Sequence, residues 1–126
     1  MTAEQALADL TEISSQVEAA TLFDAKGTVA ASTLGDPEPF VRAVQDLLAA
    51  AAEARHGSLN QLEAATGSGS VFVVRDGDSY IAATTAPEPT VALVFYDLKT
   101  ALRAAAQRPA RRRRKKTETE EDGGGS

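Results

Sequence analysis

Apolar residues recur at helical spacing near the start of the chain. They lie three residues apart, at Leu7, Leu10 and Ile13. Thr2 suits the N-cap position, and Gln5 lies where a capping box places the residue that bonds back to the cap. The pattern predicts a first amphipathic helix over about residues 3–15.

The pattern then changes to residues that suit a pleated sheet. Residues 17–23 and 28–33 are strand-like in composition, and the segment Asp24-Ala25-Lys26-Gly27 lies between them. Gly27 can adopt the left-handed conformation that a short loop requires. The sequence therefore predicts a β-hairpin.

A second helix is expected from about Pro39 to the residues before Gly57. Proline loses no hydrogen bond in the first turn of a helix, and glycine is typical of a helix end. The predicted apolar stripe consists of Phe40, Val44, Leu47, Leu48, Ala51 and Ala54. Residues 49–52 are all alanine, so every face of the middle turn is small. Either a second helix packs closely there, or the run reflects only the helix propensity of alanine.

Three strands should follow, over about residues 59–66, 71–75 and 79–85. Gly67-Ser68-Gly69 joins the first pair, and Asp76-Gly77, a typical hairpin sequence, joins the second. The first of these strands does not alternate cleanly between apolar and polar residues. This irregularity indicates a weak or edge strand that needs a partner.

Residues 90–107 allow two interpretations. Residues 91–96 have strand-like composition, but apolar residues continue at helical spacing beyond the length of a strand. They are Val91, Val94, Phe95, Leu98, Ala101 and Leu102. Length and period favour a third helix, with Leu93 and Tyr96 off its apolar stripe and available to an interface.

The composition limits the class of protein. Apolar residues make up 43% and aromatic residues 5% of the 126 residues, which predicts a thin core that benefits from burial against a second copy. The absence of cysteine excludes disulfides and thiolate chemistry and fits a reducing cytoplasm. The N-terminus lacks the pattern of a signal peptide, and no apolar run approaches the ~18 residues of a membrane span. We therefore expect a cytoplasmic protein.

Charge divides the chain into two parts. Residues 1–107 contain six basic and fourteen acidic residues, a net charge of −8, and are expected to form one domain. Residues 108–126 contain seven basic and four acidic residues, a net charge of +3, and are predicted to be a disordered tail. The acidic body does not suit nucleic acid, which requires a basic face.

The tail contains the other candidate binding site, a run of six basic residues. They are Arg111, Arg112, Arg113, Arg114, Lys115 and Lys116. Such a run could hold the protein at the inner face of an anionic membrane. The alternative is a solvated tail that its own acidic residues neutralise.

No residue pattern indicates catalysis, a metal or a cofactor. His56, the only histidine, lies at the predicted end of the second helix, where its charge would suit the helix dipole. Gly67-Ser68-Gly69-Ser70 lacks the Lys-Ser/Thr that ends a phosphate-binding loop. We expect a non-enzymatic protein that binds no nucleotide itself.

The order of elements resembles the roadblock/dynein light chain family, particularly its stand-alone bacterial members of the MglB type. The resemblance covers about residues 6–103. It depends on the Asp24–Gly27 hairpin, the helix over residues 40–57, the Asp76-Gly77 hairpin and the late segment 91–102. It implies an α/β (α+β) fold of order α-β-β-α-β-β-β-α. The five strands would form one antiparallel sheet, with the second helix on one face and the terminal helices on the other.

The resemblance also implies a dimer that binds a Ras-like GTPase. Family members pair with their second helices side by side and their third strands joined. The dimer candidates here are Ala49, Ala50, Ala52, Leu59, Gln61 and Glu63. The candidates for GTPase contact, on the polar face of the second helix, are Arg42, Gln45, Asp46, Ala49 and Glu53, although a merely solvated face explains them equally well. Two other functions stay open: a scaffold dimer without GTPase contact, and a PAS- or profilin-like sensor, which would need a pocket.

Overall fold

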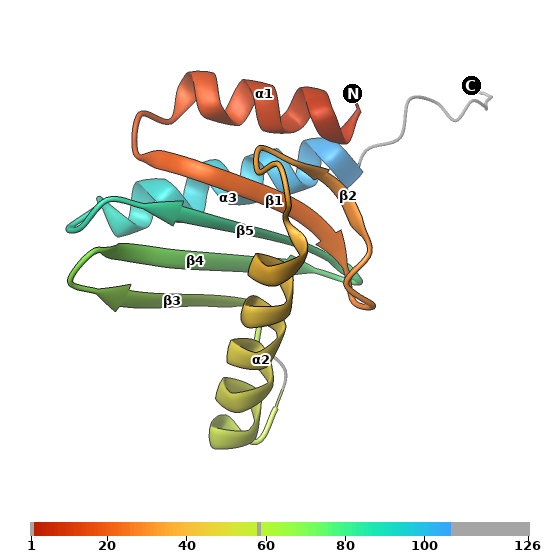
Figure 1. Ribbon diagram of the computed structural model, residues 1–126, viewed down its shortest axis with the longest axis vertical. Coiled ribbons are helices and arrows are strands. Elements are labelled where there is room, and N and C mark those ends of the chain that lie inside the picture. Colours follow the sequence, from red (N-terminus) through yellow and green to blue (C-terminus); the bar gives the residue numbers. More distant parts are fainter. Residues whose placement is uncertain (1, 58, 107–126) are drawn as a thin grey trace, which may run out of the picture.

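The computed structural model describes residues 2–57 and 59–106 (Figure 1). The elements follow the predicted order: α1 (Ala3–Ile13), β1 (Val17–Asp24), β2 (Val29–Ser32), α2 (Glu38–Arg55), β3 (Gln61–Thr66), β4 (Gly69–Asp76), β5 (Ser79–Thr85) and α3 (Val91–Ala106). The predicted domain boundary at residue 107 and the basic run 111–116 lie outside the described residues.

The five strands form one sheet of order β2-β1-β5-β4-β3, with every neighbouring pair antiparallel. The chain forms β1 and the edge strand β2, crosses through α2 to the opposite edge at β3, and returns through β4 to the central strand β5. The expected fold class is therefore confirmed.

Each face of the sheet supports its own core. The larger core joins α1 and α3 to one face and contains Leu7, Leu10, Val17, Ala20, Leu22, Ala31, Phe72, Val74, Ile81, Ala83, Val94, Leu98, Ala101 and Leu102. The smaller core joins α2 to the opposite face and contains Phe23, Val41, Val44, Val73 and Ala82. The predicted division of the helices, with α2 on one face and the terminal helices on the other, is confirmed.

The first helix begins as predicted but ends early. The Thr2 hydroxyl accepts a hydrogen bond from the Gln5 backbone N–H, and the Gln5 side chain accepts one from the Thr2 N–H, which completes a capping box. Ser14 is already extended, so the helix stops at Ile13. Ile13 was expected in the core, but it is 73% exposed.

The second helix ends at Arg55 and is capped by His56, so it stops before Gly57 as expected, although the left-handed residue is His56 and not the glycine. His56 takes the left-handed conformation, with φ 57° and ψ 48°, and its N–H donates to carbonyls of the last turn. The apolar stripe also differs from the prediction. Val41, which the prediction omitted, is buried with Val44, whereas Ala54 is exposed.

The strands and the last helix lie close to the predicted ranges. β5 has the predicted bounds, whereas β3 begins two residues late and leaves Leu59 before the strand. Gly69, in β4, has φ +151°, and a Cβ there would collide with the carbonyl oxygen of Thr85. The helical interpretation of residues 91–106 is confirmed, and Leu93 and Tyr96 are exposed as expected.

Candidate interaction surface

The outer edge of β3 is open. β3 pairs with β4 along all six of its residues, and among the described residues no strand lies on its other side. Its exposed side chains include Gln61, Glu63 and Ala65, with a single charge and no proline among the strand's residues. Unpaired N–H and C=O groups along such an edge favour pairing with another strand. The prediction of an edge strand is confirmed.

α2 lies across the opposite face from α3, and its second half extends past β3 (Figure 1). Successive residues turn about 100°, and three sets of residues on the helix each lie within an arc of about 60°, called a face here. The first faces the sheet with Val41, Val44 and Leu48, which are buried or half-buried. The overhanging half leaves the other two faces without cover from the sheet.

The second face of α2 is small and apolar. It consists of Ala43, Leu47, Ala50 and Ala54. Leu47 is half-buried and the three alanines are exposed. These residues follow at intervals of four, three and four, the spacing that forms a seam between two packed helices. Small side chains let a second backbone come close, so this seam face fits a partner helix.

The three alanines predicted for the dimer do not share one face. Ala50 lies on the seam face, but Ala49 lies on the polar face about 100° away. Ala52 lies on the side of α2 toward the sheet and, together with Ala49 at the border of the polar face, lines a hollow of about 220 Å³ beside Leu59 and Tyr80. The other predicted dimer residues, Gln61 and Glu63, lie on the open β3 edge.

The third face of α2 is polar and carries most of the candidates for GTPase contact. Arg42, Asp46, Ala49 and Glu53 are all exposed and lie within one arc of the helix. The Arg42 guanidinium lies 3.7 Å from the Glu38 carboxylate, both largely exposed, so the pair contributes at most about 0.5 kcal/mol. Both charges are therefore available to a partner.

Gln45 differs from the other candidates for GTPase contact because its side chain packs against the turn between β1 and β2. It is half-buried, and its side-chain amide lies against Gly27 in the turn between β1 and β2. A Cβ at Gly27 would lie 2.9 Å from Gln45 Nε2. The contact brings α2 against the hairpin, which the sequence pattern did not indicate.

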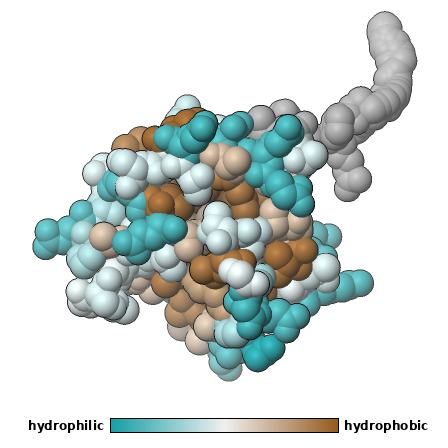
Figure 2. Space-filling view, turned by 45° about the horizontal axis from the view of Figure 1, so that its top comes forward, coloured by the Kyte–Doolittle hydropathy of each residue, from teal (hydrophilic) through white to brown (hydrophobic). Residues whose placement is uncertain are grey.

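The sheet beside α2 adds further apolar surface. Leu62 and Val71 are only partly buried and pack against the smaller core. Ala64 pairs with Val71 across β3 and β4 and is also half-buried. In Figure 2, apolar residues occupy the middle of the visible face and hydrophilic residues its rim. A patch of this kind is typical of a surface that a protein partner covers.

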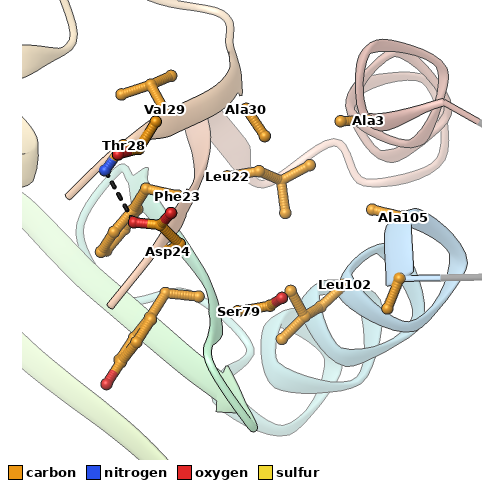
Figure 3. A pocket seen from close by; sticks show the side chains of 12 residues that line it. Ala3, Leu22, Phe23, Asp24, Thr28, Val29, Ala30, Ser79, Leu102 and Ala105 are labelled. Atoms are coloured by element: carbon orange, nitrogen blue, oxygen red, sulfur yellow. Dashed lines mark hydrogen bonds between the residues drawn. The ribbon is translucent and has the colours of Figure 1, made fainter. Parts of the chain in front are cut away.

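A small pocket lies between the hairpin and the ends of α1 and α3 (Figure 3). Its volume is about 200 Å³, below the ~300 Å³ at which small-molecule sites usually begin. Small apolar residues, including Ala3, Ala30 and Ala105, line most of it. The Asp24 carboxylate accepts hydrogen bonds from the backbone N–H groups of Lys26 and Thr28, both at 2.9 Å, so its Oδ1 serves the turn. This pocket is therefore smaller than a usual small-molecule site.

Other chemistry is sparse in the described ranges. No group of three or more His, Asp or Glu residues there could hold a metal ion. His56 is exposed at the end of α2, where its backbone closes the helix. None of the helices in residues 2–57 and 59–106 combines the length and apolar character that a membrane span requires.

Comparison with solved structures identifies the fold. The chain is similar to a Roadblock/LC7 domain from Streptomyces avermitilis, with a TM-score of 0.71 and 17% identity over 82% of this chain and 94% of that one. The fold is therefore that of roadblock/LC7 domains. Within it, the chain resembles the gliding protein MglB from Thermus thermophilus, with a TM-score of 0.62 and 21% identity over 81% of this chain and 86% of that one.

The architecture is also shared with a profilin. LokiProfilin2, solved in complex with rabbit actin, matches with a TM-score of 0.59 and 11% identity over 79% of this chain and 92% of that one. No protein-family model matches the sequence, and no curated protein sequence matches it.

Proposed function

We propose that the chain works as a homodimeric adaptor or regulator of a Ras-like small GTPase and binds it through paired α2 helices. The observation that carries this proposal is the coincidence of two unpartnered surfaces at one end of a roadblock fold. These are the open β3 edge and the seam face of α2; Figure 1 shows β3 at the border of the sheet and the second half of α2 extending beyond it.

A second copy would complete both surfaces at once. Two β3 edges related by a twofold axis pair in antiparallel fashion and join the two sheets. The seam face of α2, centred on Leu47 and Ala50, then packs against its symmetry mate. This pairing covers apolar residues on a chain whose own core is divided and thin, and it satisfies the free backbone groups of β3.

Pairing the seam faces leaves the polar faces of both helices outward. Arg42, Asp46 and Glu53 from two copies then form one mixed-charge surface around the dimer axis. Complementary charges of this kind steer a partner and fix its orientation more than they add affinity. The resemblance to MglB-type proteins implies that the partner is a Ras-like GTPase and that the adaptor repositions the GTPase's own residues, without donating a catalytic arginine.

The experiment titrates the full chain with a Ras-like GTPase encoded in the same genome, loaded with GDP or with a non-hydrolysable GTP analogue. The double variant R42E/E53R should weaken binding by about tenfold, or 1.4 kcal/mol. Lys99→Glu, an exposed change on α3, is the matched control and should leave binding intact. Unchanged binding by R42E/E53R would remove the polar face from the proposal.

The same titration separates the scaffold function from the regulatory one. A regulator should bind one nucleotide state several times more tightly than the other. A scaffold dimer without GTPase contact should bind neither state while remaining dimeric in a sedimentation experiment.

We further propose that the protein acts in the cytoplasm, either free or held at the inner membrane by the run 111–116. Flotation with vesicles containing anionic lipid tests this point. A full chain with Arg111–Arg114 replaced by serine should float less than the native chain if the run contacts lipid, and equally if the run is merely solvated.

A further inference from the structure

The face of the molecule opposite α2 carries a second apolar surface that the proposed dimer does not use. A groove of about 330 Å³ runs between α1 and α3. Small residues on both helices, Ala6, Ala101 and Ala104, leave room between them. Ile13 and Tyr96, which are 73% and 67% exposed, stand at its rim. Large apolar side chains exposed to water beside a groove are typical of a surface that binds a protein partner.

The groove also contains two acidic groups. Asp97 lines it and is only 9% exposed. Within residues 2–57 and 59–106, no ion pair or side-chain hydrogen bond reaches the Asp97 carboxylate. Asp9, across the groove on α1, adds a second acidic group. Two carboxylates on opposite walls of the groove favour a cation between them.

We propose that the groove between α1 and α3 binds a basic amphipathic helix of another protein. Its apolar side chains would pack on Leu10, Ile13 and Tyr96, and a Lys or Arg beside them would reach Asp97 and Asp9. The lining spans residues 6–13 and 96–104, about 11–12 Å of each helix at 1.5 Å per residue. That length matches two to three turns of a partner helix, which would use apolar anchors at positions i, i+3 or i+4, and i+7.

Two other occupants of the groove can be considered, a second copy of the chain and the chain's own residues 107–126. A second copy would set the same acidic groove against its own carboxylates, which repel one another. The chain's own residues 107–126 contain the needed cations, but their only apolar side chains are Pro109 and Ala110, too few to cover the groove floor.

The test uses a fluorescein-labelled helical peptide with leucines on one face and lysines beside them. Fluorescence anisotropy measures its binding to the full chain at about 0.15 M salt, where the Debye length is about 8 Å and weak surface attraction is largely screened. Ile13→Ser and Tyr96→Ser should each weaken binding by about tenfold, as expected for interface anchors. Leu93→Ser is the matched control, because Leu93 is exposed on the same helix but lies outside the groove lining, and it should change binding less than twofold.

Charge is tested separately from apolar contact. Asp97→Asn should weaken binding of the lysine peptide by about fivefold and reduce its salt dependence. A peptide with glutamate in place of lysine should not bind. Equal binding by a peptide whose leucines are scattered around the helix, or equal losses with Leu93→Ser and Tyr96→Ser, would overturn the proposal.

One further variant checks the occupant. A variant of the full chain in which serine replaces Arg111–Arg114 should bind the peptide as tightly as the native chain does. A gain of tenfold or more, about 1.4 kcal/mol, would mean that residues 107–126 compete for the groove, and the proposed external helix would be wrong. The assay contains no GTPase, so its result is independent of the function proposed for α2.

Discussion

Two neighbouring alanines provide a sharp test of the proposed dimer. Ala49 and Ala50 are both exposed in the single chain and lie in the same turn of α2. They point about 100° apart, Ala49 with the polar face and Ala50 with the seam face. The same substitution, alanine to glutamate, can therefore be made on either face with equal chemistry. Only Ala50→Glu should disturb pairing.

The magnitude follows from what each glutamate meets. In an isolated chain both side chains remain in water, so each variant should stay within about 0.5 kcal/mol of the native free energy of unfolding. In the dimer, Ala50→Glu places one carboxylate from each copy in an apolar seam that contains no described cation. Effective desolvation costs several kcal/mol per buried ion, so even ~2 kcal/mol for each copy gives ~4 kcal/mol for the dimer. That value raises the dimer dissociation constant by about three powers of ten.

Sedimentation equilibrium over a range of protein concentrations measures the dissociation constant, and circular dichroism checks that both variants fold. Ala50→Glu should sediment as a folded single chain where the native protein and Ala49→Glu sediment as dimers. A dimeric Ala50→Glu would refute the seam. Equal dissociation by Ala49→Glu would show that net charge, and not the geometry of α2, controls pairing.

Three predictions concern stability, each measured by urea unfolding. His56→Gly should raise the free energy of unfolding by about 1 kcal/mol, because glycine adopts the left-handed conformation without the penalty of a side chain; a decrease would mean that the imidazole contributes more than the strain costs. Gly69→Ala should lower the free energy of unfolding by about 2 kcal/mol, because φ is +151° there and the new Cβ would collide with the Thr85 carbonyl oxygen. Gly67→Ala is the control: its Cβ would meet open space, so the free energy should change by under about 0.5 kcal/mol. Phe72→Ala should lower it by about 3–5 kcal/mol, because the ring is fully buried; a loss below 1 kcal/mol would contradict the core as described.

Patterns within single elements could be predicted from the sequence, whereas contacts between elements could not. The capping box at Thr2 and the Asp76-Gly77 turn depend on neighbouring residues, and both are present. The helical period of residues 91–106 correctly outweighed their strand-like composition. Such features need only local chemistry.

The errors come from features that tertiary geometry decides. Ile13 continues the helical period, but the helix ends there and the side chain points into water. The sequence also could not divide α2 into three faces, because the core-facing arc depends on where the sheet lies. Gln45 contacts Gly27, which lies 18 positions earlier in the chain. Asp97 lies in a groove that two separate helices form. Neither residue type nor spacing indicates such contacts.

The two borders of the sheet are unequal, and the difference limits how far assembly can proceed. β2 has only four residues, and its pairing with β1 is interrupted by an irregularity between Leu22 and Phe23. Short, distorted borders discourage further strand addition, whereas β3 is longer and its pairing with β4 is regular. If only β3 can accept another strand, and it accepts a copy of itself, the contact is isologous and closed. Growth then stops at two chains, and a sheet with an open border avoids polymerising into fibres.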